Sequence, residues 1–184
     1  MEEFFGFILS SDRTCEKNAC SETYYLLKNV LGLEVILAKP VHNISGLSLV
    51  RITTDPIPIL SKIEEVILND QSILRYAHKL VPITHKIETN LNGIESLSRE
   101  LSQKIQEHET WKISLRRRHS KYSRNEIIGI AAQEINVGKV ELENPTWFLI
   151  IEVIGRWTYM SLSPKESISI SKHRPDESDD YLSF

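Results

Sequence analysis

The nine residues from Arg116 to Arg124 are the part of this sequence best suited to binding chemistry. Five of them are Lys or Arg, namely Arg116, Arg117, Arg118, Lys121 and Arg124. Guanidinium groups donate paired hydrogen bonds that match phosphate oxygens. Tyr122 lies within the same run and offers a ring on which a base could stack. The cluster therefore predicts a site for a polyanion, with RNA as the favoured ligand.

A helix is predicted to begin directly after this cluster. Ser123 and Glu126 have the spacing of a capping box. The first turn of a helix presents unpaired backbone N–H groups and a partial positive charge, and both favour a phosphate. The alternative interpretation of the basic run is a solvated charged loop without a ligand.

Two further groups of residues are weaker candidates for binding. One is a second basic stretch that contains Arg75, His78, Lys79, His85 and Lys86. Strand alternation would place these side chains on both faces, so ordinary surface charge is the favoured interpretation. The other group is Trp157 and Tyr159, which would share one strand face, and a place in the core is favoured for them.

Motifs for catalysis or for metal binding are missing from the sequence. The six histidines lack the spacing of metal ligands, and the seven glycines are too sparse for a nucleotide-binding loop. Glu152 lies in an apolar run, where burial would raise its pKa and make it a candidate base. An ion pair with a neighbouring arginine is the favoured interpretation. We therefore expect no metal, no cofactor and no small-molecule substrate.

The composition hides a segregation of charge. The formal net charge is only -3, yet the residues from 176 to 180 read Asp-Glu-Ser-Asp-Asp, opposite in sign to the basic cluster. Cys15 and Cys20 fit neither a disulfide framework nor a zinc site and predict free thiols in a reducing compartment. The acidic first residues do not resemble a signal peptide, and no apolar run is long enough for a membrane span. A cytoplasmic protein is expected.

The first half of the chain alternates patterns of strand and helix. The predicted elements are strands at 4–9, 34–38, 47–53 and 74–81, and helices at 19–31 and from Pro56 onward. Asp55 would cap the second helix, whose buried stripe would be Ile59, Ile63, Val66 and Ile67. This order predicts an α+β fold with a ferredoxin-like first domain over residues 1–82. Pro82 would end the last strand, and residues 82–91 would connect the domains.

The second half predicts another α/β unit over residues 83–163. A helix begins at a capping box of Asn92 and Glu95 and buries Ile94, Leu97, Leu101 and Ile105. The further elements are a strand at 111–118, a helix from Ser123 to about Ile135, and strands at 147–154 and 157–162 joined by Gly155 and Arg156. Residues 164–184 are expected to form a mobile acidic tail, although Ile168 and Ile170 could extend a sheet edge.

Three of these runs together resemble a THUMP domain, namely 117–128, 140–148 and 151–155. More narrowly, they are similar to the THUMP proteins that act as tRNA-binding adaptors of the RNA cytidine acetyltransferase. The run 75–83 is similar to the segment that joins a preceding ferredoxin-like domain to THUMP in that group.

The resemblance implies a tRNA-binding platform that holds the acceptor stem and its 3′ end. The implied RNA contacts are Arg116, Arg117, Arg118, Lys121, Tyr122, Ser123, Arg124 and Asn125, with Arg75 and Lys79 as weaker candidates. The roughly twenty residues after Leu162 are too few for a catalytic domain, so we expect a non-catalytic adaptor. A partner enzyme would then form N4-acetylcytidine in the tRNA.

Two alternatives to the adaptor remain open. One is an RNA-modifying enzyme with an acid/base site at Glu152 and His119. The other is a protein-interaction module whose basic loop docks on an acidic surface, including the chain's own residues 176–180.

Overall fold

Strands and helices alternate in the first half as the apolar pattern predicts. The computed structural model describes residues 2–170, and its first elements are β1 (Glu2–Ser11), α1 (Glu16–Tyr24), β2 (Val35–Pro40), β3 (Leu47–Ile52), α2 (Leu60–Asn69) and β4 (Ala77–Glu88). The strands pair antiparallel in the order β2-β3-β1-β4. This is the predicted ferredoxin-like arrangement of an α+β fold.

Each helix of this half is continued at one end by a turn that is not α-helical. A π-helical turn over Tyr25–Val30 extends α1, and Gly32 follows with a φ of +69°. The side chain of Asp55 accepts a hydrogen bond from the Ile57 backbone N–H, and a 3-10 turn over Ile57–Ile59 precedes α2. The buried stripe of α2 is consequently Leu60, Ile63 and Ile67, whereas Ile59 and Val66 are only partly buried.

The second half continues the same sheet with α3 (Leu91–Ser102), β5 (Thr110–Arg118), α4 (Arg124–Gln133), β6 (Lys139–Val140), β7 (Trp147–Ile154) and β8 (Trp157–Ser163). The strand order runs on from β4 as β8-β7-β5-β6. The predicted cap of α3 at Asn92 is wrong, because the Asn90 side chain accepts the hydrogen bond from the Gly93 N–H. Ile94, Leu97, Leu101 and Ile105 are buried as predicted.

β4 belongs to both halves, since it pairs with β1 along one stretch and with β8 along another. The boundary expected at residue 82 therefore falls inside a strand, and residues 82–88 are not a connecting loop. Pro82 lies opposite Phe7 in the pairing of β4 with β1. Its missing N–H is tolerated there, and its carbonyl accepts a hydrogen bond from the Ser161 hydroxyl.

The chain returns from the second half to the first through residues 164–170, called the return segment below. Within it, β9 (Ile168–Ser169) pairs with β4, and Ile168 and Ile170 are buried in the core of the first half. Lys165 pairs with Glu64 of α2. Residues 164–170 are therefore part of the folded structure, whereas the sequence predicted a mobile tail that begins at residue 164. The acidic run 176–180 lies outside the described residues.

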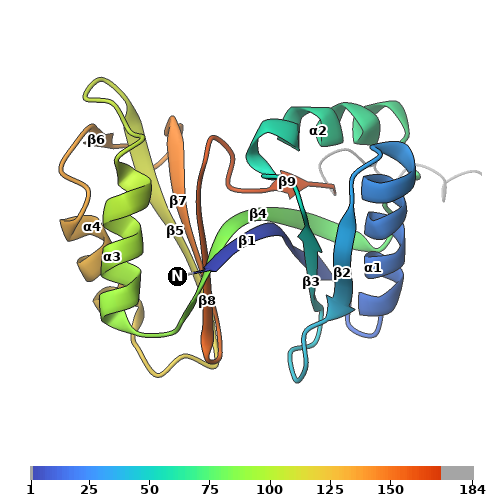
Figure 1. Ribbon diagram of the computed structural model, residues 1–184, viewed down its shortest axis with the longest axis horizontal. Coiled ribbons are helices and arrows are strands. Elements are labelled where there is room, and N and C mark those ends of the chain that lie inside the picture. Colours follow the sequence, from blue (N-terminus) through green and yellow to red (C-terminus); the bar gives the residue numbers. More distant parts are fainter. Residues whose placement is uncertain (1, 171–184) are drawn as a thin grey trace, which may run out of the picture.

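A third apolar core lies between the halves. It combines Phe4, Ile8, Leu49 and Ile83 of the first half with Ile150, Ile154 and Tyr159 of the second. The helices α1 and α2 lie toward the outside of one half, and α3 and α4 lie toward the outside of the other (Figure 1). The two halves therefore form one continuous structure. None of the helices within residues 2–170 is long and apolar enough to cross a membrane.

Candidate functional site

Two hairpins, one from each half, form the walls of a groove of about 760 Å³. The β2–β3 hairpin and the β7–β8 hairpin both turn at the lower edge of the molecule (Figure 1). The basic side chains that line this inter-hairpin groove are Lys39, His42, Arg51, Lys86, His119 and Arg156. Among the described residues, no carboxylate lines it. The groove is therefore suited to an anionic ligand.

The wall from the second half is the two-residue turn that the sequence predicts. Ile154 pairs with Trp157, and Gly155 between them has a φ of +60°, which glycine adopts without steric cost. Arg156 occupies the second turn position and is exposed. The turn thus presents a cation at the mouth of the groove.

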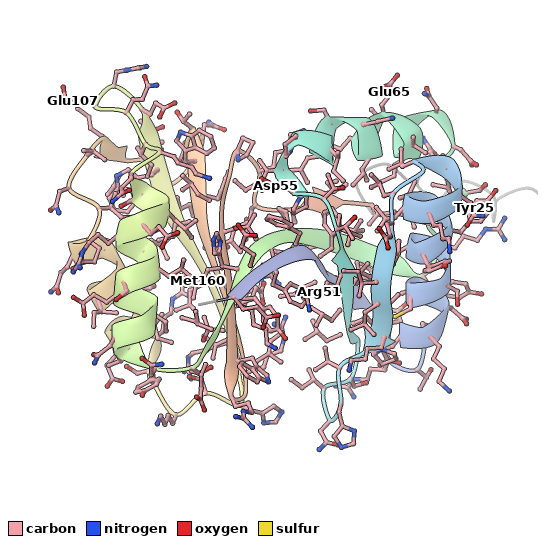
Figure 2. The ribbon with its side chains drawn as sticks, viewed as in Figure 1. Tyr25, Arg51, Asp55, Glu65, Glu107 and Met160 are labelled. Carbon is pink, nitrogen blue, oxygen red and sulfur yellow. The ribbon has the colours of Figure 1, made fainter. Side chains whose placement is uncertain are left out.

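Cations alternate with aromatic rings along the groove. The ammonium of Lys86 lies 3.9 Å from the centroid of the Trp157 ring, and the guanidinium of Arg156 lies 4.9 Å from it. Farther along, the Arg51 guanidinium lies 5.1 Å from the Phe4 ring, which meets Tyr159 edge-on. Figure 2 labels Arg51 in the middle of the molecule, between the two halves. Phe4 and Tyr159 are buried, so Trp157, which is partly exposed, is the ring of this group that could contact a base, beside cations suited to phosphates.

Two exposed acids at the rim partly neutralise these cations. Glu2 pairs with Arg51 at 3.1 Å and with Lys86 at 3.9 Å, and Glu88 pairs with Arg156 at 3.6 Å. The side chains of Glu2 and Glu88 are 52% and 67% exposed. Exposed ion pairs contribute only about 0–1 kcal/mol. A phosphate can therefore displace either carboxylate at low cost.

The basic corner, Arg116–Arg124, contains the predicted ion pair. Arg118 Nη1 lies 2.7 Å from a carboxylate oxygen of Glu152, and Arg116 Nε lies 3.9 Å from the other oxygen. Glu152 is 3% exposed. Burial raises the pKa of its carboxyl, and the adjacent Arg118 opposes that rise. The carboxylate is thus held as a buried counter-ion of two arginines.

Other groups of the basic corner are also engaged within the protein. Arg124 donates to the carbonyl of Leu115. The predicted capping box is present, with the Glu126 carboxylate accepting from the Ser123 N–H and the Ser123 hydroxyl accepting from the Glu126 N–H. These bonds with Ser123 hold the pKa of the Glu126 carboxyl below its usual value. An anion at the start of α4 therefore competes with the protein's own acid.

Arg117, Lys121 and Asn125 remain exposed at this corner. The Lys121 ammonium lies 5.0 Å from the Tyr122 ring. His119 has a φ of +53°, which is uncommon for a residue other than glycine. It lines both the inter-hairpin groove and a smaller hollow of about 270 Å³ that includes Lys121 and Arg156. The corner and the groove consequently form one continuous surface.

Arg75 and Lys79 lie away from this surface. The backbone N–H of Arg75 donates to Glu22 of α1, and Lys79 lies opposite Ser169 of β9 in the first half. Conversely, the sequence interpretation missed Lys39, Arg51 and Arg156 as binding residues. Arg156 stands in the hairpin turn that the sequence predicts, and a search for cations at such turns would have found it. Lys39 lies within β2 and Arg51 within β3, where no local signal distinguishes them.

Removing Arg118 should destabilise the protein. Arg118→Met leaves the buried Glu152 with only the more distant Arg116, which costs about 2–3 kcal/mol of unfolding free energy. The variant should also lose stability more steeply with rising pH. The pKa of Glu152 in the folded protein already lies above its unfolded value of 4.5. Stability from this group therefore falls as pH rises above 4.5, and losing Arg118 extends that fall to higher pH.

Urea unfolding measured from pH 4 to 8 checks this expectation. The matched control is Arg116→Met, because the Arg116 side chain is 45% exposed and more distant from Glu152. It should cost less than about 1 kcal/mol. Equal stabilities of the two variants at every pH would contradict the assigned role of Arg118.

Comparison with known proteins gives one family match and several shared folds. Residues 88–163 match the family model described as the THUMP domain, and no curated protein matches. The crystal structure of PH1313 from Pyrococcus horikoshii Ot3 aligns with a TM-score of 0.64 at 14% identity, over 90% of this chain and 55% of that chain.

Two further solved structures share the fold. TrmN from Thermus thermophilus aligns with a TM-score of 0.60 at 16% identity, over 91% of this chain and 47% of its own. A 4-thiouridine synthetase, solved in complex with RNA and with bound ATP, aligns with a TM-score of 0.55 at 12% identity, over 90% of this chain and 42% of its own. The chain thus spans about half the length of these proteins.

Proposed function

Because residues 88–163 match the family model of the THUMP domain, we propose that this chain binds tRNA and serves tRNA modification. The contact surface is the inter-hairpin groove together with the exposed residues of the basic corner. The 4-thiouridine synthetase that shares the fold was solved in complex with RNA, which supports an RNA ligand.

The placement of two cations beside the partly exposed ring of Trp157 is the observation that carries this proposal. Single-stranded RNA is bound through its phosphates and through stacking of its bases on aromatic side chains. Lys86, Trp157 and Arg156 provide both kinds of contact within one short stretch of the groove. The unpaired 3′ end of a tRNA fits this chemistry, and the acceptor stem would then lie along Arg117 and Lys121.

The chain acts as a non-catalytic adaptor in this proposal. PH1313, TrmN and the 4-thiouridine synthetase share this fold, although they are differently named proteins and the shared part covers only 42–55% of each chain. The shared half is therefore better suited to a common step, such as holding the RNA, than to one reaction. The ion pair with Arg118 also weakens the alternative in which Glu152 acts as a base. From the resemblance described above, the partner is a tRNA cytidine N4-acetyltransferase.

Nucleoside analysis by mass spectrometry tests the adaptor role. Purified chain incubated with tRNA should leave every nucleoside unchanged. Addition of the acetyltransferase and its acetyl donor should produce N4-acetylcytidine, and omission of the chain should reduce that product strongly. A modified nucleoside formed by the chain alone would refute the adaptor role and leave RNA binding intact.

Arg117 is the cleanest probe of the basic corner, because its side chain is exposed and forms no ion pair within residues 2–170. Arg117→Ala should weaken tRNA binding about three- to tenfold and reduce the salt slope by about one, as expected for one phosphate contact. Fluorescence anisotropy over a salt series measures both quantities.

The matched control for Arg117→Ala is Lys62→Ala, which removes one exposed cation from α2. Arg75→Ala and Lys79→Ala should have smaller effects than Arg117→Ala, because both residues lie in the first half, away from the groove. If Arg117→Ala and Lys62→Ala bind tRNA with the same affinity and slope, the basic corner is not a contact surface.

A further inference from the structure

The inter-hairpin groove has the chemistry of a site that the chain can fill by itself. Its lining combines Lys39, Lys86 and Arg156 with the apolar rings of Phe4 and Trp157. The segment 176–184, which lies outside the described residues, reads Asp-Glu-Ser-Asp-Asp-Tyr-Leu-Ser-Phe. This segment places four carboxylates directly before two aromatic rings and a leucine. The carboxylates are opposite in charge to the cations of the groove, and the apolar side chains that follow match its apolar part.

We propose that residues 176–184 occupy the inter-hairpin groove when RNA is absent and that tRNA must displace them. The contact itself requires only the groove and the segment. Its regulatory meaning rests on the proposed function, because competition matters only if RNA uses the same groove.

The length of chain available is sufficient for this contact. The last described residue, Ile170, donates its N–H to the carbonyl of His78 on β4. From His78 to Lys86 along β4 is about 26 Å at the rise of a strand. An extended chain from residue 170 to residue 180 spans up to roughly 33 Å. Because β9 runs antiparallel to β4, the chain leaves Ile170 in the direction away from Lys86 and must first turn back. The difference between the two lengths, about 7 Å, is available for this turn, so Asp180 reaches the cations around Trp157 when the segment is nearly fully extended. The rings of Tyr181 and Phe184 then reach the apolar part of the groove.

The physical strength of the contact comes from attachment to the same chain. A tethered segment is present at an effective concentration of the order of millimolar, so even weak binding fills the site substantially. Occupancy of roughly 80–90% would lower the apparent affinity for tRNA about five- to tenfold. Since the attraction is between exposed charges, it should weaken at high ionic strength.

Neutralising the segment in the full chain tests the competition. The variant carries Asp176→Asn, Glu177→Gln, Asp179→Asn and Asp180→Asn. The control carries Glu65→Gln, Glu100→Gln, Glu107→Gln and Glu143→Gln, which changes the net charge equally. All four control residues are exposed, and Glu65 and Glu107 lie at the upper edge of the molecule, opposite the hairpin turns (Figure 2). At about 0.05 M salt the tail variant should bind tRNA about five- to tenfold more tightly than the control.

An RNA-independent measurement separates the contact from the proposed function. The indole N–H of Trp157, a groove residue, should shift in the NMR spectrum when the segment is neutralised. The indoles of Trp111 and Trp147, which donate to Val137 and Glu109, should stay unchanged.

The outcomes of the two measurements are distinct. An unchanged Trp157 resonance together with equal tRNA affinities of the tail variant and the control would overturn the inference and leave RNA binding standing. A Trp157 shift in a protein that binds no tRNA would support the contact and refute the proposed function.

Discussion

A chain that carries Lys86→Glu and Arg156→Glu should bind tRNA about 100-fold more weakly at an ionic strength near 0.1 M. Both cations flank Trp157, at 3.9 and 4.9 Å from the ring centroid. Their replacement removes two phosphate contacts and places two carboxylates where phosphates would lie. Repulsion then adds to the lost attraction, so this should be the largest effect of any surface change on binding.

Fluorescence anisotropy with labelled tRNA measures the loss. Lys17→Glu with Lys62→Glu is the control, because both side chains are exposed on the helices of the first half and the net charge changes equally. The Lys86 side chain is only 20% exposed, so Arg156→Glu alone, at a side chain 70% exposed, guards against a folding defect. It should lower affinity about tenfold. Affinities equal to that of the control would remove the groove from the proposed contact surface.

The largest expected loss of stability follows from changes in the return segment. Ile168→Ala with Ile170→Ala should lower the free energy of unfolding by about 4–8 kcal/mol, since each truncation leaves a cavity in a packed core. Ile168 is 0% and Ile170 1% exposed, and both pack in the core of the first half. That loss is comparable to the whole stability of many domains.

Urea denaturation followed by circular dichroism measures this loss. Val140→Ala is a suitable control, because Val140 is an apolar β-strand residue that is 61% exposed. It should cost less than about 0.5 kcal/mol. If the double variant unfolds at the same urea concentration as the control, the return segment does not contribute to the core of the first half.

Features encoded by near neighbours in the sequence were predicted well. The capping box of Ser123 and Glu126 and the turn at Gly155 depend on residues within four positions of one another, and both are present. The path of β4 was missed because Pro82 normally breaks a strand, and its tolerance here depends on Phe7 and Ser161, which are distant in sequence. β6 was missed because two residues are too few for a periodic pattern.

The candidate site was predicted only where its residues are contiguous. The basic corner could be found because its arginines are adjacent in the sequence. The groove could not, because its cations range from Lys39 to Arg156 and each is unremarkable among its neighbours. They meet only through the pairing of Lys86 with Tyr159 and through the third core between the halves. Alternation along a single strand contains no information about either contact.

The strand that the two halves share restricts movement of one half against the other, and this affects which ligands the groove can accept. β4 crosses from one half to the other as continuous hydrogen-bonded backbone, so no hinge residue separates the two walls of the groove. The distance between those walls is therefore fixed. A ligand must already have a thickness that fits this distance, because the walls do not close around it. Once residues 176–184 have left the groove, association should need no movement of one half against the other, and its rate should depend on ionic strength.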